Sequence, residues 1–227
     1  MSGALRPGLP PLPRRMEHLP IDDRGFPVPW FVAWIDGKPD HRIMDGAKIW
    51  PAIRGGLCWQ CGEQLGRFKS FCIGPMCSIT RTIGEPPSHR ECLQYAVRAC
   101  PWMTRPHAKR REIGLPDDHR FPDGGVRRNP GAVCIWTTTS FMPFRADRSI
   151  LFELGDPEST EWYAEGRPAT RAEVDESIAS GLHLLREPAE QEDAQNPARG
   201  AVAELERRIA RETARLNAMQ WPEGAPT

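Results

Sequence analysis

Two pairs of residues in the first half of the chain have spacings typical of metal ligands. Cys58 and Cys61 form a C-x-x-C-G knuckle, in which a tight turn brings two thiolates onto one ion and Gly62 relieves crowding. His89 and Cys92 form an H-x-x-C pair, and residues three apart at the start of a helix point to one place. Three thiolates and one imidazole suit tetrahedral Zn²⁺ better than magnesium or calcium. We therefore predict one bound zinc ion.

The helix that carries the second pair has the clearest start signal in the sequence. Two prolines precede it, and Ser88 with Glu91 matches a capping box, in which each side chain binds a free backbone N–H group. We expect this helix to span residues 89–100. The partial positive charge at its N-terminus would favour the thiolate form of Cys92.

The number of ligands indicates what the zinc ion does. Four ligands fill its coordination shell, which is typical of a structural ion rather than a catalytic one. A zinc deaminase would need H-x-E followed by P-C-x-x-C. Residues 89–91 read H-x-E, but the C-x-x-C pair lies upstream of them, with Leu57 where proline is needed. We expect a binding protein rather than an enzyme.

The chain has seven cysteines, and three or four of them are left over from the zinc site. Cys77 remains an alternative to His89 as the fourth ligand. Cys100 is eight residues beyond Cys92, about 80° around a helix, and we expect it to be buried together with Cys72 and Cys134. The N-terminal residues lack the apolar segment of an export signal, so we expect reduced thiols in a cytoplasmic protein.

The two ligand pairs resemble the treble-clef zinc finger over residues 57–100. That family joins a knuckle and a β-hairpin to a helix whose first turn supplies the last two ligands. The resemblance implies the same ligand set, namely Cys58, Cys61, His89 and Cys92.

A second resemblance covers most of the chain beyond its first residues. It is to a family of short actinobacterial and actinophage proteins of uncharacterised function, and it implies no activity. The stretches that carry it are residues 74–77, 85–89, 99–101 and 162–168.

The length of 227 residues, with 39% hydrophobic and 26% charged residues, fits one large domain or two small ones and excludes a fibrous or wholly disordered chain. No apolar run is long enough to span a membrane. We predict an α+β fold with a treble-clef module and N-terminal hairpin, then a small antiparallel sheet with a packed helix. The predicted divisions are a disordered Pro-rich arm (1–26), a zinc domain (27–102), a basic connecting loop (103–130), a small α+β domain (131–186), an acidic linker (187–196) and a C-terminal amphipathic helix (197–220).

The net charge of zero hides an asymmetry between the two halves. Residues 1–112 hold 17 basic and 10 acidic residues, whereas residues 113–227 hold 13 and 20. The halves could attract each other, or the first could contact a polyanion. We predict that a basic tract binds DNA or RNA through phosphate contacts. Its residues are Arg98, Arg105, Lys109, Arg110 and Arg111.

Two further functions remain open from the sequence. The apolar stripe of the C-terminal helix, from Val202 to Met219, could dock a protein partner or a second copy of the chain. Asp118-His119 with Asn129 resembles the start of an HNH-type endonuclease motif, although no helical histidine follows and residues 132–138 look like a strand.

Overall fold

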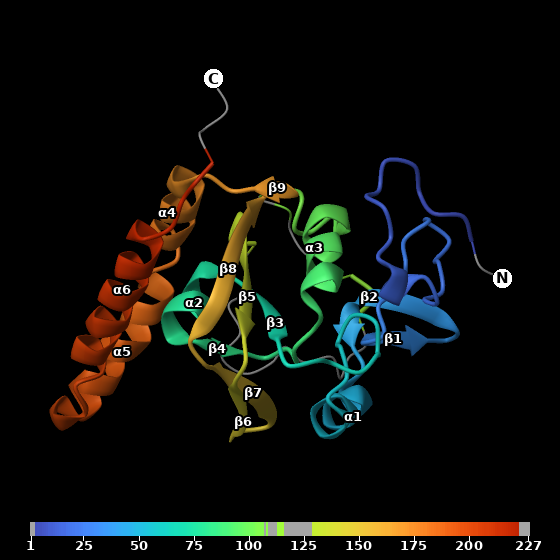
Figure 1. Cartoon of the computed structure of the whole chain (residues 1–227). Helices are drawn as coiled ribbons and strands as arrows, with labels where there is room; N and C mark the ends of the chain where they lie inside the picture. The colour runs from blue at the N-terminus through green and yellow to red at the C-terminus, as the bar shows by residue number, and fades with distance from the viewer. Residues whose placement is uncertain (1–2, 107, 109–112, 116–128, 223–227) are drawn as a thin grey trace.

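The computed structural model describes residues 3–106, 108, 113–115 and 129–222 and has an α+β fold built on antiparallel sheets (Figure 1). Its central sheet has the strand order β3-β5-β8-β9. The strands are β3 (Lys69–Ile73), β5 (Ala132–Thr138), β8 (Pro157–Ala164) and β9 (Arg167–Pro168).

The pairing of β3 with β5 joins the two halves of the chain. Phe71 lies opposite Trp136 and Ile73 opposite Cys134 in this antiparallel ladder, and all four are buried in the main core. On the same ladder, the hydroxyl groups of Ser70 and Thr137 lie 2.8 Å apart. The sheet therefore crosses the boundary that we predicted between a zinc domain and a second α+β domain.

Two layers cover the central sheet. Helix α3 (Arg90–Ala99) packs on one face, where Leu93 and Val97 contact Ile135. The other face meets the main core, to which a second sheet contributes Phe152 and Leu154. This sheet has the order β4-β7-β6, and its strands are β4 (Thr82–Ile83), β7 (Ser149–Leu154) and β6 (Phe141–Ala146).

The segment between β3 and α3 differs from the expected hairpin. Helix α2 (Pro75–Thr80) follows β3 directly, and β4 then pairs with β7 in the second sheet. Strands β3 and β4 thus lie in different sheets, so the β-hairpin that the treble-clef resemblance implies between knuckle and helix does not form here.

The N-terminal part of the chain carries the predicted hairpin of β1 (Val32–Ile35) and β2 (Lys38–Met44). Asp45 caps the short 3-10 helix η2 (Gly46–Lys48) by accepting a hydrogen bond from the Ala47 N–H. Helix α1 (Ile49–Gly55) follows and ends at Gly56, which has the left-handed conformation expected there.

The Pro-rich arm at residues 1–26 is not a free tail in its described part, contrary to our prediction. It contains the 3-10 helix η1 (Arg14–Met16), and the side chains of Met16 and Leu19 are 1% and 5% exposed. The arm packs against the knuckle and α3, and this contact buries its apolar residues.

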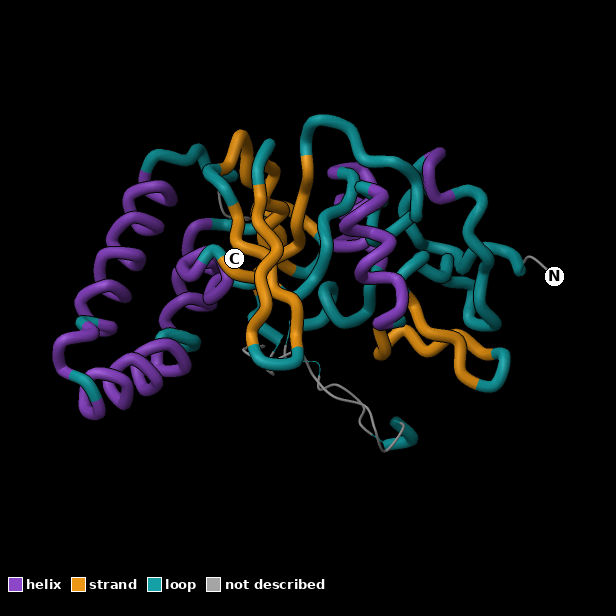
Figure 2. The backbone as a smooth tube through the Cα atoms, turned by 90° about the horizontal axis from the view of Figure 1, so that it is seen from below, coloured by secondary structure: helices purple, strands orange, loops and turns teal. Residues whose placement is uncertain are grey.

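Helices α4 (Arg171–Ala179), α5 (His183–Gln195) and α6 (Ala201–Asn217) lie on the side of the sheets opposite the N-terminal hairpin (Figures 1 and 2). A capping box of Thr170 and Glu173, which matches the S/T-x-x-E pattern in the sequence, starts α4. The prediction of an acidic linker at residues 187–196 is wrong, because α5 extends to Gln195. Its Asp193 carboxylate accepts hydrogen bonds from the N–H groups of Ala201 and Val202 and so caps α6.

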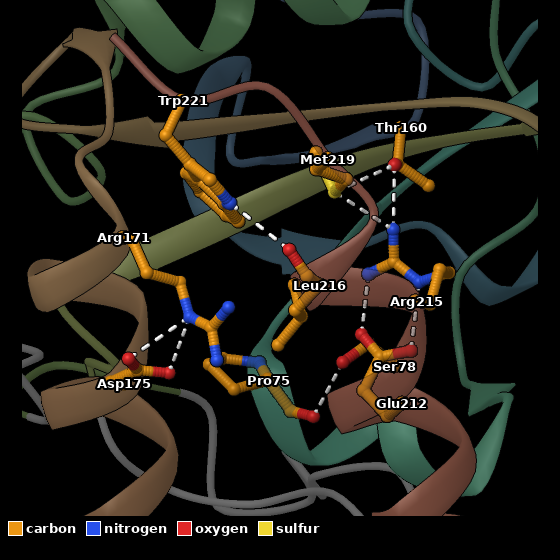
Figure 3. Close-up of polar contacts among 10 residues, drawn as sticks. All are labelled: Pro75, Ser78, Thr160, Arg171, Asp175, Glu212, Arg215, Leu216, Met219 and Trp221. Carbon is orange, nitrogen blue, oxygen red and sulfur yellow. Dashed lines mark hydrogen bonds and ion pairs between the residues drawn. The ribbon is translucent and has the colours of Figure 1, made fainter. Parts of the chain in front are cut away.

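The predicted C-terminal helix at 197–220 begins instead with the 3-10 turn η3 (Pro197–Arg199), and α6 follows after Gly200. A largely buried ion pair between Glu212 and Arg215 lies on α6 (Figure 3). The Glu212 and Arg215 side chains are 5% and 17% exposed, and Arg215 also donates to Thr160 Oγ1 over 2.6 Å.

Candidate metal centre

Cys58, Cys61, His89 and Cys92 come together in one cluster that could hold a metal ion. One ligand atom from each of the four lies within 4.8 Å of all the others. The Nδ1 atom of His89 is 3.4 Å from the Sγ atom of Cys61 and 3.9 Å from that of Cys92. A zinc ion with tetrahedral bonds to sulfur and nitrogen separates its ligand atoms by about 3.5–3.8 Å. The cluster thus has nearly the dimensions of a tetrahedral site.

The knuckle is shaped by backbone hydrogen bonds and by one glycine. The Cys58 N–H binds the Glu63 carbonyl, and the Gly62 N–H binds the Cys58 carbonyl, both over 2.8 Å. Gly62 has a φ of 77°, and a Cβ atom there would lie 2.7 Å from the Trp30 ring. A side chain at this position would therefore be strained and would also displace the ring.

Two N–H groups point at the sulfur of Cys58. The Cys61 N–H donates to it over 3.5 Å and the His89 N–H over 3.3 Å. These bonds link the two ligand pairs through their backbones, and they favour the thiolate form that metal binding requires.

His89 is held with one ring nitrogen toward the sulfurs and the other toward the backbone. Its Nε2 atom lies 3.1 Å from the Gln64 carbonyl oxygen. A carbonyl can only accept, so Nε2 carries the proton in a neutral ring, and Nδ1 keeps its lone pair for a metal ion. Such a partner on the second nitrogen is the usual arrangement of a metal-binding histidine.

The predicted capping box at α3 does not form. His89 is the residue that caps the helix, with no side-chain hydrogen bond to the backbone. The backbone of Ser88 is engaged elsewhere, in two hydrogen bonds with Ser70 of β3. The Glu91 carboxylate instead binds Arg15 over 2.7 Å. The helix start is therefore fixed by a bridge to the sheet, which the local sequence cannot indicate.

Hydrogen bonds within the cluster shift the proton affinities of its members. Burial opposes ionisation of Cys58, but hydrogen bonds from Cys61, Cys92 and His89 outweigh it and lower the pKa of Cys58. Hydrogen bonds to Cys58 and Cys61 raise the pKa of His89 to about 10 and also raise the pKa of Cys92. Metal binding needs the deprotonated ligand atoms, so a divalent cation bound there would displace protons from the cluster.

The N-terminal arm completes the surroundings of the cluster, and the sequence reasoning missed it. The Cys58, Cys61 and Cys92 side chains share one buried group with residues from the arm. The signal was present as apolar residues at helical spacing within the proline-rich stretch. They are Leu9, Leu12, Met16 and Leu19.

Cys77 is not a member of the cluster, so the alternative ligand set is not formed. It lies in α2 and packs against the main core, where burial raises its pKa to about 11. Burial likewise raises the pKa values of Cys72, Cys100 and Cys134. These thiols stay protonated and behave as small apolar side chains.

Only part of the predicted basic tract lies among the described residues. Arg98 is exposed on α3, with its Nε–H bound to the Gln94 carbonyl over 2.7 Å, and Arg105 is exposed beyond that helix. Lys109, Arg110 and Arg111 lie outside the described residues. The two basic side chains that can be placed have no carboxylate partner in the described part of the chain.

The nuclease motif is also only partly placed, since Asp118 and His119 lie outside the described residues. The side-chain amide of Asn129 donates to the carbonyls of Trp102 and Arg105 and its oxygen accepts from the Gly131 N–H. Asn129 is thus fully occupied in closing a loop. The expected helix position is taken by β5.

Comparison with family models, curated proteins and solved structures finds no match to this chain. None of the helices in the described ranges is long and apolar enough to cross a bilayer.

Proposed function

We propose that the chain is a zinc-binding protein in which one structural Zn²⁺ is held by Cys58, Cys61, His89 and Cys92. The observation that carries this proposal is the Nδ1 atom of His89, which faces Cys61 Sγ while Nε2 is held by the Gln64 carbonyl. Three sulfurs and one nitrogen form a donor set that prefers zinc among the divalent ions with no redox role.

A structural role fits the place of the cluster in the fold. The ion would cross-link the knuckle to the first turn of α3, and α3 packs on the central sheet through Leu93 and Val97. Four protein ligands leave no position for a reacting water. Because zinc needs the three cysteines reduced, the proposal includes a cytoplasmic location.

Metal analysis tests this proposal. We expect one equivalent of zinc per chain after purification without added metal. Replacement by Co²⁺ should give the intense absorption of tetrahedral cobalt bound to thiolates, and that signal should weaken in Cys61→Ser and stay unchanged in Cys77→Ser. Substoichiometric metal, or equal loss in both variants, would contradict the assignment.

We further propose that the protein contacts DNA or RNA through the basic tract that includes Arg98 and Arg105. Both side chains are exposed and neither has a carboxylate partner among the residues that the structure describes, which supports this proposal. In Arg98→Ala/Arg105→Ala, the dependence of affinity on salt should become shallower, by about 0.7–0.9 in the log–log slope for each lost phosphate contact. An unchanged slope would remove these two residues from the interface.

The apolar face of α6, which the alternative of partner docking would need, packs against other parts of the chain in the described residues. The apolar residues of α6 pack within the chain itself: Leu205 and Ile209 contact α2, and Leu216 joins the main core. Met219, just beyond α6, also packs against that core. The exposed face of α6 is charged, with ion pairs such as Glu204 to Arg207. We therefore do not propose α6 as a docking site.

A further inference from the structure

Two aromatic side chains beside the knuckle are exposed, and an arginine lies against each ring. Trp50 of α1 is 45% exposed and Phe68, just before β3, is 52% exposed. The Cζ atom of Arg54 is 5.2 Å from the centre of the Trp50 ring, and that of Arg67 is 5.6 Å from the centre of the Phe68 ring. Such cation–π contacts hold the side chains together.

Backbone hydrogen bonds bring these two pairs to the same region. The Leu65 N–H donates to the Gly56 carbonyl over 2.7 Å, and Leu57 forms an isolated bridge with Gln64. The end of α1, which carries Arg54, is thus bound to the segment that leads directly into Arg67 and Phe68. Arg54 and Arg67 each lie two residues along the chain from the residues joined by this hydrogen bond.

Neither Arg54 nor Arg67 has a carboxylate partner among the described residues. The acidic residues closest in sequence are already engaged, since Asp45 binds Lys48 and Glu63 binds Arg15. The two guanidinium groups therefore keep N–H donors that a phosphate could accept from.

We propose that this aromatic–arginine surface, formed by Trp50, Arg54, Arg67 and Phe68, binds single-stranded nucleic acid. Unpaired bases would stack on the two rings, and backbone phosphates would accept hydrogen bonds from the two arginines. A duplex offers no free base faces, so the rings select for single strands. This inference rests on the proposed nucleic-acid function and adds to it a second contact surface with a different chemistry.

The experiment is an anisotropy titration of the zinc-loaded full chain with fluorescein-labelled oligothymidylate and oligouridylate of about 12 nucleotides, and with a duplex of the same length. Trp50→Ala/Phe68→Ala should weaken single-strand binding by about tenfold for each ring removed. Trp50→Phe/Phe68→Tyr keeps both rings and should bind close to wild type. The matched control is Met142→Ala/Phe144→Ala, which removes two exposed apolar side chains from the edge strand β6 and should change nothing.

The outcomes separate this inference from the proposed basic tract. Loss in the alanine pair, with recovery in the aromatic pair, supports the surface, and relative affinity for the two oligonucleotides shows whether DNA or RNA is preferred. If only Arg98→Ala/Arg105→Ala weakens binding, or if the duplex binds as tightly as the single strand, the surface is overturned while the basic tract stands. If no oligonucleotide binds, both fall. Circular dichroism and metal content of each variant establish that it is folded.

Discussion

The Nε2 atom of His18 lies 3.0 Å from the carbonyl oxygen of Cys61, so the N-terminal arm is hydrogen-bonded to a metal-ligand residue. Arg15 in the same arm binds Glu63 over 2.8 Å and Glu91 over 2.7 Å, one from each ligand-bearing segment. The arm therefore spans both halves of the metal cluster. Met16 of the arm is buried in the same apolar cluster as Cys58, Cys61 and Cys92, so the arm covers the cysteine side chains.

The cover predicts slow metal release that depends on Met16. In Met16→Ala the lost packing should destabilise the protein by about 2–5 kcal/mol and open the arm, so that a chromophoric chelator removes zinc faster than from wild type. Arg14→Ala, in the same 3-10 turn but exposed, is the matched control and should release zinc at the wild-type rate. Release at equal rates from Met16→Ala and wild type would mean that the arm does not limit metal exchange.

The ligand set predicts different results for two substitutions of His89. His89→Ala removes one ligand and should lower zinc affinity at least about 100-fold, because even loss of a supporting contact to a ligand costs about 10–100-fold. His89→Cys supplies a fourth thiolate and should retain one zinc equivalent. Competition with a chelator of known affinity measures both. Equal affinities for wild type and His89→Ala would show that the ring is not a ligand.

The metal cluster could be predicted because each of its two ligand pairs has a recognisable spacing in the local sequence. Two pairs with a spacing of three residues define the knuckle and the helix start, and the structure brings all four side chains together. The capping box of Thr170 and Glu173 was predictable for the same reason. The local sequence indicates the geometry where a motif's partners are its own neighbours, but Ser88 and Glu91 at α3 show that contacts with distant residues can override it.

The predictions that the structure contradicts concern elements whose positions depend on contacts between residues distant in the sequence. The partner of β3 is β5, about 60 residues away, and no local pattern indicates that choice. The same holds for the proline-rich arm, where Met16 and Leu19 are buried and Leu9 and Leu12 partly buried because the knuckle and α3 offer a surface. In α5, Leu185 and Ala189 pack near α6 and fix a helix that the acidic composition of residues 187–196 obscured.

Acid should weaken the fold through His41. Burial lowers the pKa of His41 and nearby Arg24 lowers it further, while Asp22 opposes both. The unfolded chain, with a histidine pKa near 6.5, then binds more protons than the folded one, so stability rises with pH through the window below 6.5 and is lost as pH falls through it.

Unfolding by urea at about pH 7.5 and about pH 5.5 measures this effect. Wild type should lose more stability than His41→Gln on acidification, by less than about 1.4 kcal/mol, the value of one full pK unit. The zinc ligands titrate equally in both proteins, so the difference between them isolates His41. Parallel losses in the two proteins would exclude this histidine as the source.

Removing one partner of the Glu212–Arg215 ion pair should destabilise the protein strongly, whereas replacing both charges with apolar side chains should destabilise it little. Glu212 Oε2 accepts from Arg215 Nε over 2.9 Å, and the Arg215 guanidinium lies 5.2 Å from the centre of the Trp136 ring. Glu212→Ala leaves a buried cation without its partner, which we expect to cost about 3–5 kcal/mol in urea unfolding. The double variant Glu212→Leu/Arg215→Met removes both charges and should recover most of that loss.

A matched control on the same helix separates burial from helix position. Glu204 pairs with Arg207 at the same spacing and also with Arg208, but these side chains are 46%, 68% and 39% exposed. Water replaces the partner there, so Glu204→Ala should leave the unfolding midpoint nearly unchanged. If Glu212→Ala also leaves it unchanged, water reaches Arg215 and the pair is not desolvated. If the double variant is as unstable as the single one, the ion pair contributes more than apolar packing can replace.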